Sequence, residues 1–211
     1  MVAVDARTGS ERQWYISSRW LEYDGEGRAN LLRIVAIGAF YSVQLVQFYG
    51  IGQSDPALLP FHQRATALAV AWTMLALAVL LCLRRRVFPA ALKYCSAGGD
   101  ILLLAGLVWL AGGPANAIGR AFFLIIALAA LRFSLGLVWF STLGSMLAYE
   151  ALVGLADETW FDANHAIPPV ENLIMLVSLG LTGLVLGQVI RRTRALADDY
   201  AARLEKLRGQ A

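Results

Sequence analysis

The sequence predicts an all-α fold, a polytopic membrane bundle of about six transmembrane helices with both ends on the cytoplasmic side. Its composition, the length of its apolar runs and its charge distribution support this prediction. Of the 211 residues, 58% are hydrophobic and 16% are charged, against roughly 45–50% and about 25% in soluble domains. The apolar residues gather in runs of 16 to 21 residues. Such lengths suit helices that cross a hydrocarbon core about 30 Å thick.

Six segments have this length and hydropathy, and only short connections separate them. They are residues 31–50, 65–83, 95–113, 118–133, 135–155 and 173–190. The chain therefore divides into a polar N-terminal segment, 1–30, a transmembrane domain, 31–190, and a C-terminal tail, 191–211. No connection is long enough to hold a second globular domain.

The fourth segment carries charge near both of its ends. It is free of charge only from 121 to 131, so Arg120 and Arg132 must extend toward opposite interfaces if the segment is to span. If they do not, the segment is re-entrant and the topology changes.

The basic residues give the orientation. With the N-terminus inside, 16 of the 18 fall in cytoplasmic segments or at cytoplasmic helix ends, and only Arg64 and Arg120 face outward. An excess of Lys and Arg in short cytoplasmic loops is the general rule for membrane proteins. We therefore expect a multi-pass protein of the cytoplasmic membrane with both termini in the cytoplasm.

The N-terminal segment mixes aromatic and charged side chains. It contains Trp14, Tyr15, Trp20 and Tyr23 among Arg12, Arg19 and Glu22. Its start is acidic as often as basic, which is atypical of signal peptides and mitochondrial presequences. Aromatic and basic side chains favour the headgroup level, so we expect an interfacial segment. A docking surface for a partner protein is the alternative.

Polar side chains inside or at the ends of spans are costly in lipid and are candidate functional residues. In the predicted topology five of them lie toward the non-cytoplasmic side: Gln44, Gln47, His62, Glu150 and Asn172. One hypothesis is an outer pocket that binds a small ligand. The other is that each group hydrogen-bonds a neighbouring helix. Asp100 lies toward the inner half, and we expect it to form an interfacial ion pair with Arg132 or Lys93.

The sequence indicates no catalytic, metal or cofactor site. The two histidines, His62 and His165, both lie on the predicted outer side, and no H-E-x-x-H or Cys/His cluster accompanies them. Cys82 and Cys95 form no C-x-x-C motif, and both lie near predicted cytoplasmic helix ends. No nucleotide-binding or phosphate-loop signature is present. We therefore predict a protein that is not an enzyme and binds no cofactor.

The last span and the tail carry two interaction motifs. Gly183 and Gly187 form a G-x-x-x-G motif, which lets helix backbones approach closely. It predicts packing either within the bundle or on a second protein. The tail continues without a helix breaker and places Leu196, Tyr200, Leu204 and Leu207 in one apolar stripe. That stripe is typical of a short coiled coil with a stutter, or of a tail lying on lipid headgroups.

Residues 92–152 resemble the six-helix membrane sensor modules of some bacterial histidine kinases and nucleotide cyclases. The resemblance rests on the LAGGPANA turn at 110–117, the ALRF hairpin at 130–133 and the small-residue helix that ends in Tyr149. In those families the last helix enters a signalling coiled coil, which implies the same for residues 191–207. This sequence ends at Ala211, where such families continue into a kinase or cyclase domain, so no such activity is carried over. Two alternatives follow: the chain is a fragment of a sensor, or it is a free-standing relative that has become a structural partner of another membrane assembly.

Together these observations predict a non-catalytic module of a bacterial inner membrane. It binds membrane partners or a small ligand and couples to cytoplasmic partners through its last helix. The expected partners are membrane lipids, other membrane subunits or a second copy of the chain, and no nucleic acid. The alternative is an accessory structural subunit of a respiratory, photosynthetic or similar membrane complex.

Overall fold

The computed structural model describes the backbone of residues 2–51, 59–86, 89, 91–156 and 167–208. Side chains before residue 23, that of residue 51, and most of those beyond residue 200 lie outside this description. The described residues are helical or lie in turns, and they contain no strand. The predicted all-α class is thereby confirmed.

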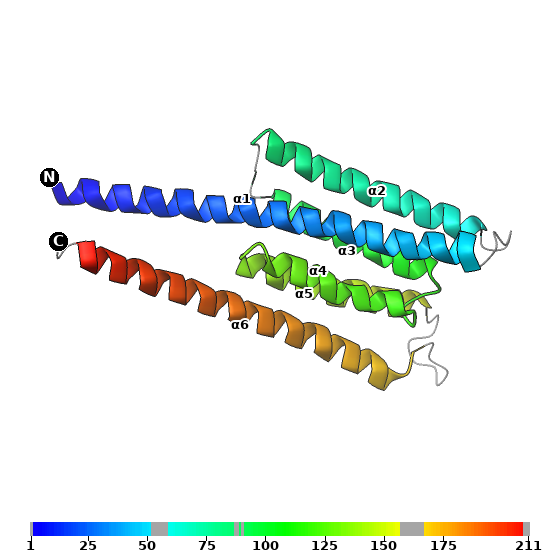
Figure 1. Cartoon of the computed structure of the whole chain (residues 1–211). Helices are drawn as coiled ribbons and strands as arrows, with labels where there is room; N and C mark the ends of the chain where they lie inside the picture. Colours follow the sequence, from blue (N-terminus) through cyan, green and yellow to red (C-terminus); the bar gives the residue numbers. More distant parts are fainter. Residues whose placement is uncertain (1, 52–58, 87–88, 90, 157–166, 209–211) are drawn as a thin grey trace.

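Six α-helices and two short helical segments follow one another along the chain. In order they are α1 Val2–Leu45, the π-helix η1 Val46–Ile51, α2 Leu59–Arg84, α3 Leu92–Leu110, the 3-10 helix η3 Ala117–Ala121, α4 Phe122–Ala130, α5 Leu135–Ala156 and α6 Pro169–Arg208. Successive α-helices run in alternating directions, and the two termini lie at the same end of the bundle (Figure 1).

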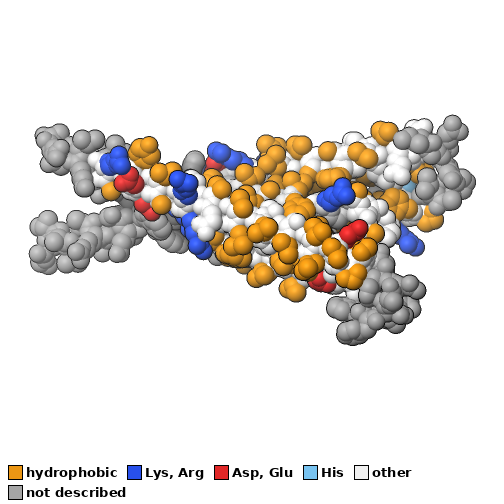
Figure 2. Space-filling model, turned by 90° about the horizontal axis from the view of Figure 1, so that it is seen from below, with side chains coloured by type: hydrophobic (Ala, Val, Ile, Leu, Met, Phe, Trp, Pro, Cys, Tyr) orange, Lys and Arg blue, Asp and Glu red, His pale blue; other side chains and the backbone are white. Residues whose placement is uncertain are grey.

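Five of these helices are long and apolar enough to cross a membrane. The spans are Tyr23–Gly50, Leu59–Arg84, Leu92–Leu110, Leu135–Ala156 and Pro169–Tyr200. The outward faces are also apolar: Leu102 on α3 and Leu147 on α5 are 73% and 71% exposed. Figure 2 shows such side chains covering the middle of one face. Apolar surface of this extent is stable only in contact with lipid or other apolar partners, and the chain is a multi-pass membrane protein.

The predicted fourth span, 118–133, is shorter than the other five. It consists of η3 and of α4, an α-helix of nine residues that covers only about 14 Å. Asn116 begins it by accepting a hydrogen bond from the Ile118 amide at 3.0 Å. It ends in a tight turn at 131–134, where Phe133 adopts the left-handed conformation with φ 49°. Because α4 is short and deeply packed, it resembles a core helix more than a lipid-facing span.

The apolar core lies among α3, α4, α5 and α6. Phe122 and Ile126 of α4 are fully buried, as are Leu137 of α5 and Leu179 of α6. Small residues bring α5 and α6 close together, because an added Cβ on Gly183 would lie 2.2 Å from Thr142 Oγ1. This core holds the bundle on one side, and α1 and α2 pack beside it.

The first and last helices are much longer than a bilayer requires. α1 has 44 residues and α6 has 40, against about 20 for a simple span. Neither has a break at the predicted domain boundaries near residues 30 and 190. Both extend beyond the other helices at the end where the termini lie (Figure 1).

Candidate functional site

A cavity of about 340 Å³ lies between α1, α2, α3 and the η3–α4 segment. This volume is near the lower end of the roughly 300–1,000 Å³ typical of small-molecule sites. Its walls are mainly aliphatic and aromatic, and its few polar side chains come from four helical elements. The lining includes Arg33, Phe40, Tyr41, Gln44, Gln47, Phe61, Trp72, Asp100, Leu104, Ile118 and Leu128.

An ion pair between α1 and α3 closes one part of this cavity. Arg33 donates from Nε to Asp100 Oδ1 at 2.8 Å and from Nη2 to Asp100 Oδ2 at 2.7 Å. The two side chains are only 2% and 3% exposed. This two-point geometry is the strongest form of an Arg–carboxylate contact. It neutralises both charges where water has little access.

Two further side chains, Trp72 and Asn30, form hydrogen bonds to this ion pair. Trp72 Nε1 of α2 donates to Asp100 Oδ1 at 2.8 Å. Asn30 accepts from Arg33 Nη1 at 2.6 Å and donates to the Ala76 carbonyl oxygen at 3.1 Å. We call Asn30, Arg33, Trp72 and Asp100 the polar cluster. It joins α1, α2 and α3 through hydrogen bonds that leave neither charge without a partner.

A second buried ion pair lies closer to the end of the bundle that carries the termini. Arg132 Nε is 3.0 Å from Glu26 Oε2, and the side chains are 2% and 0% exposed. Neither of these two atoms has a hydrogen-bond partner among the described residues, so the contact is an ion pair only. Ser96 donates to Glu26 Oε1 at 3.2 Å, and Arg132 Nη1 donates to the Lys93 carbonyl oxygen at 3.1 Å.

Arg132 lies in the turn between α4 and α5, outside the helices long enough to span. Burial lowers the pKa of its guanidinium from the ordinary value, and the facing Glu26 carboxylate opposes that shift. The arginine therefore depends on Glu26 for its compensation.

A glycine allows α1 to approach this turn. An added Cβ on Gly25 would lie 2.9 Å from both Arg132 Cα and the Leu131 carbonyl oxygen. Because those atoms belong to the backbone, they have little freedom to move aside. The absence of a side chain at Gly25 thus brings Glu26 within reach of Arg132.

The expected partners of Asp100 were wrong. The sequence favoured Arg132 or Lys93, whereas Asp100 pairs with Arg33, 67 residues away. Arg132 also does not extend to an interface, because Glu26 compensates it inside the protein. The sequence analysis did not predict that Arg33 and Glu26 face the interior of the bundle. Their spacing could have indicated it, because Glu26, Asn30 and Arg33 have the i, i+4, i+7 spacing of one helical face.

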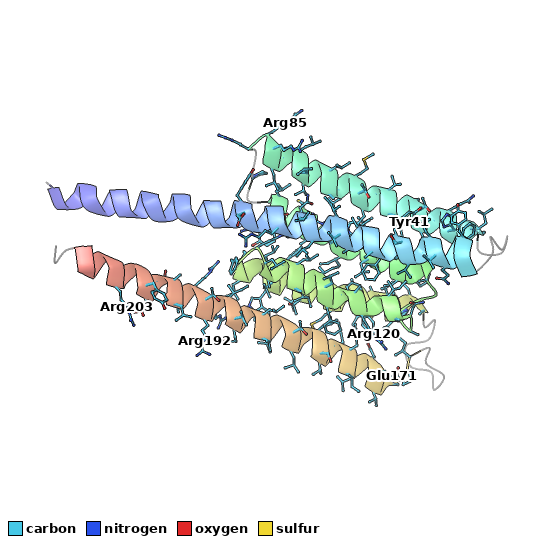
Figure 3. The ribbon with its side chains drawn as sticks, in the orientation of Figure 1. Tyr41, Arg85, Arg120, Glu171, Arg192 and Arg203 are labelled. Carbon is cyan, nitrogen blue, oxygen red and sulfur yellow. The ribbon has the colours of Figure 1, made fainter. Side chains whose placement is uncertain are left out.

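The predicted outer-pocket residues fall in three places. Gln44 and Gln47 line the cavity. His62 is outside its lining and stacks on Phe48, with ring centroids 4.2 Å apart. Asn172 donates from Nδ2 to Glu150 Oε1 at 3.1 Å, which joins α6 to α5. The neighbouring Glu171 is exposed near the start of α6 (Figure 3).

Both glycines of the G-x-x-x-G motif face α5 of the same chain. Gly183 lies against Thr142, and an added Cβ on Gly187 would be 3.3 Å from Leu135 Cδ1. Beyond this contact α6 continues outward with Arg192 and Arg203 on its surface (Figure 3). Leu196 and Tyr200 are exposed there. The side chains of Leu204 and Leu207, the rest of the predicted stripe, lie outside the described residues.

Within the described residues no group of three or more His, Cys, Asp and Glu side chains is placed to hold a metal ion. No protein-family model, curated protein or solved structure matches this chain. The resemblance of residues 92–152 to membrane sensor modules therefore stays a prediction.

Proposed function

We propose that this chain is a non-catalytic module of the bacterial inner membrane that binds a small membrane-soluble molecule in the α1–α4 cavity. In this proposal the chain crosses the bilayer six times, α4 being the shortest crossing, and both termini are cytoplasmic. Occupancy of the cavity changes the position of α1, and the long helices α1 and α6 carry that change to cytoplasmic partners.

One observation carries the proposal. α1 contributes residues from Arg33 to Gln44 to the cavity wall, and the same helix extends without interruption back to Val2. A ligand that contacts this wall therefore contacts an element that reaches well beyond the bundle. Rigid helices are suitable carriers of such a displacement.

The turn at 131–134 supports a connection from α1 to α6. Arg132 in this turn forms the ion pair with Glu26 of α1, and Arg194 of α6 donates to the carbonyl oxygen of the next residue, Phe133. The two long helices thus bind adjacent residues of one turn. A movement of α1 at Glu26 would alter the contacts of α6 at Arg194.

A cavity-filling variant tests this proposal. Ala69 lines the cavity on α2, whereas Ala78 is an exposed residue of the same helix that does not line it. Ala69→Trp should abolish any bound small molecule seen by native mass spectrometry after purification in mild detergent. It should also shift the distance between spin labels at residues 28 and 192. Ala78→Trp should change neither. Equal behaviour of the two variants would contradict the proposal.

A second candidate is an accessory subunit of a larger membrane complex. It is favoured by Leu196 and Tyr200, which are 54% and 66% exposed on the projecting part of α6 and lie on one face at i, i+4. Such a pair is available to a partner helix. Purification in mild detergent separates the two candidates, because a stoichiometric set of other membrane chains supports the subunit and a homodimer supports the sensor.

Labelling of single cysteines tests the proposed orientation. In a background without Cys82 and Cys95, a cysteine replacing the exposed Glu171 should react with an impermeant reagent added outside intact cells. A cysteine replacing the exposed Arg203 should react only after the membrane is opened. The reverse pattern would place both termini outside.

A further inference from the structure

Two amide side chains that line the cavity form no hydrogen bond with any residue that the structure describes. They belong to Gln44 and Gln47. An amide facing an apolar space in a membrane is unfavourable unless a partner is supplied. We call this pair the amide end of the cavity. It presents both N–H donors and carbonyl acceptors to an occupant.

The charges of the cavity exclude a charged occupant. Among the described residues of its lining, only Arg33 and Asp100 are charged, and they neutralise each other through two hydrogen bonds. A phosphate or carboxylate headgroup would find no free cation there, and an ammonium group would find no free carboxylate. The occupant that fits is therefore uncharged.

The lining changes along the cavity. Phe40, Tyr41 and Phe61 lie toward the amide end, and Phe40 shares the helix face of Gln44 and Gln47. The walls nearer the polar cluster include Leu104 and Leu128, and the indole of Trp72 is the aromatic exception there. Aromatic side chains favour flat rings, through stacked or edge-to-face contacts. Aliphatic walls favour a hydrocarbon chain.

The cavity is long compared with a single ring. The Cα positions of Arg33 and Gln47 are separated by 14 residues of helix, 47 minus 33, which is about 21 Å at 1.5 Å per residue. The π-helix η1, which contains Gln47, widens the helix at the amide end. Single π-helical turns are frequent at functional sites. An elongated molecule with a ring at one end would use this whole length.

We propose that the occupant is an uncharged, membrane-soluble molecule that joins a carbonyl-bearing ring to an aliphatic tail, the chemistry of quinones. The ring lies among Phe40, Tyr41 and Phe61, and its carbonyl oxygens accept hydrogen bonds from the amides of Gln44 and Gln47. The tail follows the aliphatic walls toward the polar cluster. This proposal rests on the ligand-binding function proposed above and names the class of ligand.

Binding of a radiolabelled, decyl-substituted benzoquinone to the full chain in nanodiscs tests the proposal. Gln44→Leu and Gln47→Leu each remove one hydrogen-bonding group while keeping an apolar side chain of similar size. We expect each to weaken binding about three- to tenfold, and the double variant about tenfold to a hundredfold. Gln188→Leu is the matched control, because Gln188 is exposed on α6 and does not line the cavity. It should bind as the unaltered protein does.

Two further measurements separate the class of ligand from the existence of the site. Decyl alcohol carries the same tail and no carbonyl ring, so it should compete at least tenfold more weakly than unlabelled quinone. Gln44→Asn retains the amide and should restore part of the affinity lost in Gln44→Leu. Equal competition by decyl alcohol, or unchanged affinity of the double variant, would overturn the quinone proposal.

The cavity-filling variant Ala69→Trp completes the comparison. If it removes quinone binding while the double glutamine variant binds normally, the cavity is a ligand site and only the proposed class of ligand is wrong. If neither variant alters quinone binding, or if the unaltered protein binds no quinone, the quinone proposal fails. The native mass spectrum of the purified protein then decides separately whether the cavity holds another molecule.

Discussion

The two sides of the bundle are held together by different forces. α3, α4, α5 and α6 share an apolar core in which small residues interlock, whereas α1 is attached through the two buried ion pairs at Glu26 and Arg33. In the most apolar 18-residue stretch of the first span, Tyr23–Gly50, 11% of the stretch is buried inside the protein. In the corresponding stretch of α5 the buried share is 39%. In lipid, apolar surface gives helices no strong preference for each other over the acyl chains. The poorly buried helix is therefore the one that depends on polar contacts.

The two kinds of attachment predict that the α3–α6 side is fixed and that the α1 side can change its position. Close packing fixes the α3–α6 side in one arrangement, because densely packed interiors do not deform continuously. The α1 side retains a cavity beside its polar cluster, so its position depends on a small number of directional bonds. The predictions below compare the two modes of attachment.

The largest effect is expected at the buried ion pair of the polar cluster. Asp100→Asn leaves the Arg33 charge uncompensated and should lower the free energy of unfolding by about 3–5 kcal/mol. Replacing both partners, as Arg33→Met with Asp100→Leu, should cost much less, since no isolated charge remains. Unfolding of the detergent-solubilised protein by sodium dodecyl sulfate measures both. A loss under about 1 kcal/mol for Asp100→Asn would show that α1 is attached by other contacts.

A smaller loss is expected where α1 approaches the α4–α5 turn. Gly25→Ala places a methyl group 2.9 Å from backbone atoms of that turn, and overpacking of this kind typically costs about 1–3 kcal/mol. Gly27→Ala is the control on the same helix, because its Cβ would meet nothing within 4 Å. It should stabilise the helix by up to about 1 kcal/mol. The same unfolding assay applies, and equal values for the two variants would rule out the close contact.

The corresponding test on the core side uses α6. Gly183→Ala places its methyl group 2.9 Å from Thr142 Cβ, an atom that side-chain rotation does not move, and Thr142 Oγ1 is itself bonded to the Val138 carbonyl oxygen. We therefore expect a loss of about 1–3 kcal/mol. Gly180→Ala meets nothing within 4 Å and should be neutral or stabilising. If Gly183→Ala proved neutral while lowering the amount of a co-purified partner, the motif would serve an intermolecular contact instead.

The smallest effect is expected at an exposed ion pair on α1. Arg28 lies 2.8 Å from Asp24 at i, i+4, with side chains 71% and 46% exposed. Such pairs contribute about 0.3–0.5 kcal/mol and weaken as salt is added. Arg28→Gln should therefore change the unfolding midpoint only slightly at low salt and not at high salt. A loss comparable to that of Asp100→Asn would mean that burial does not distinguish the two pairs.

Hydropathy was sufficient to predict α2 and α5, but not that α1 continues without a break through the segment expected to be interfacial, 1–30. The predicted span 135–155 corresponds to α5, Leu135–Ala156, and the predicted 65–83 lies within α2, Leu59–Arg84. Each of these helices is apolar over nearly all of its predicted span, so that span can be read from local composition. In the predicted segment 118–133 the helix ends at Ala130, and Arg132 lies in the turn that follows. The pairing of Arg132 with Glu26 could not be read from either residue's own surroundings.

The candidate site was predictable only in part. Gln44 and Gln47 were predicted to be ligand-binding residues because they are isolated amides within a span, and both line the cavity. The bond between Arg33 and Asp100 joins residues 67 positions apart, and nothing in a single sequence specifies which of several arginines an aspartate will meet. Trp72 was missed for a related reason: an indole in an apolar span is typical of lipid-facing surface as well as of a hydrogen-bond donor.

Because α1 is long and unbroken, a small tilt of this helix within the bundle produces a large displacement of its N-terminal end. Val2 is 24 residues before Glu26, 26 minus 2, so a straight helix places its tip about 36 Å from that ion pair. With Glu26 as the pivot, a tilt of about 5° would displace the tip by ~3 Å, roughly the width of one water molecule. The helix acts as a lever arm, and the same rotation near the pivot would change side-chain contacts by only a fraction of an ångström.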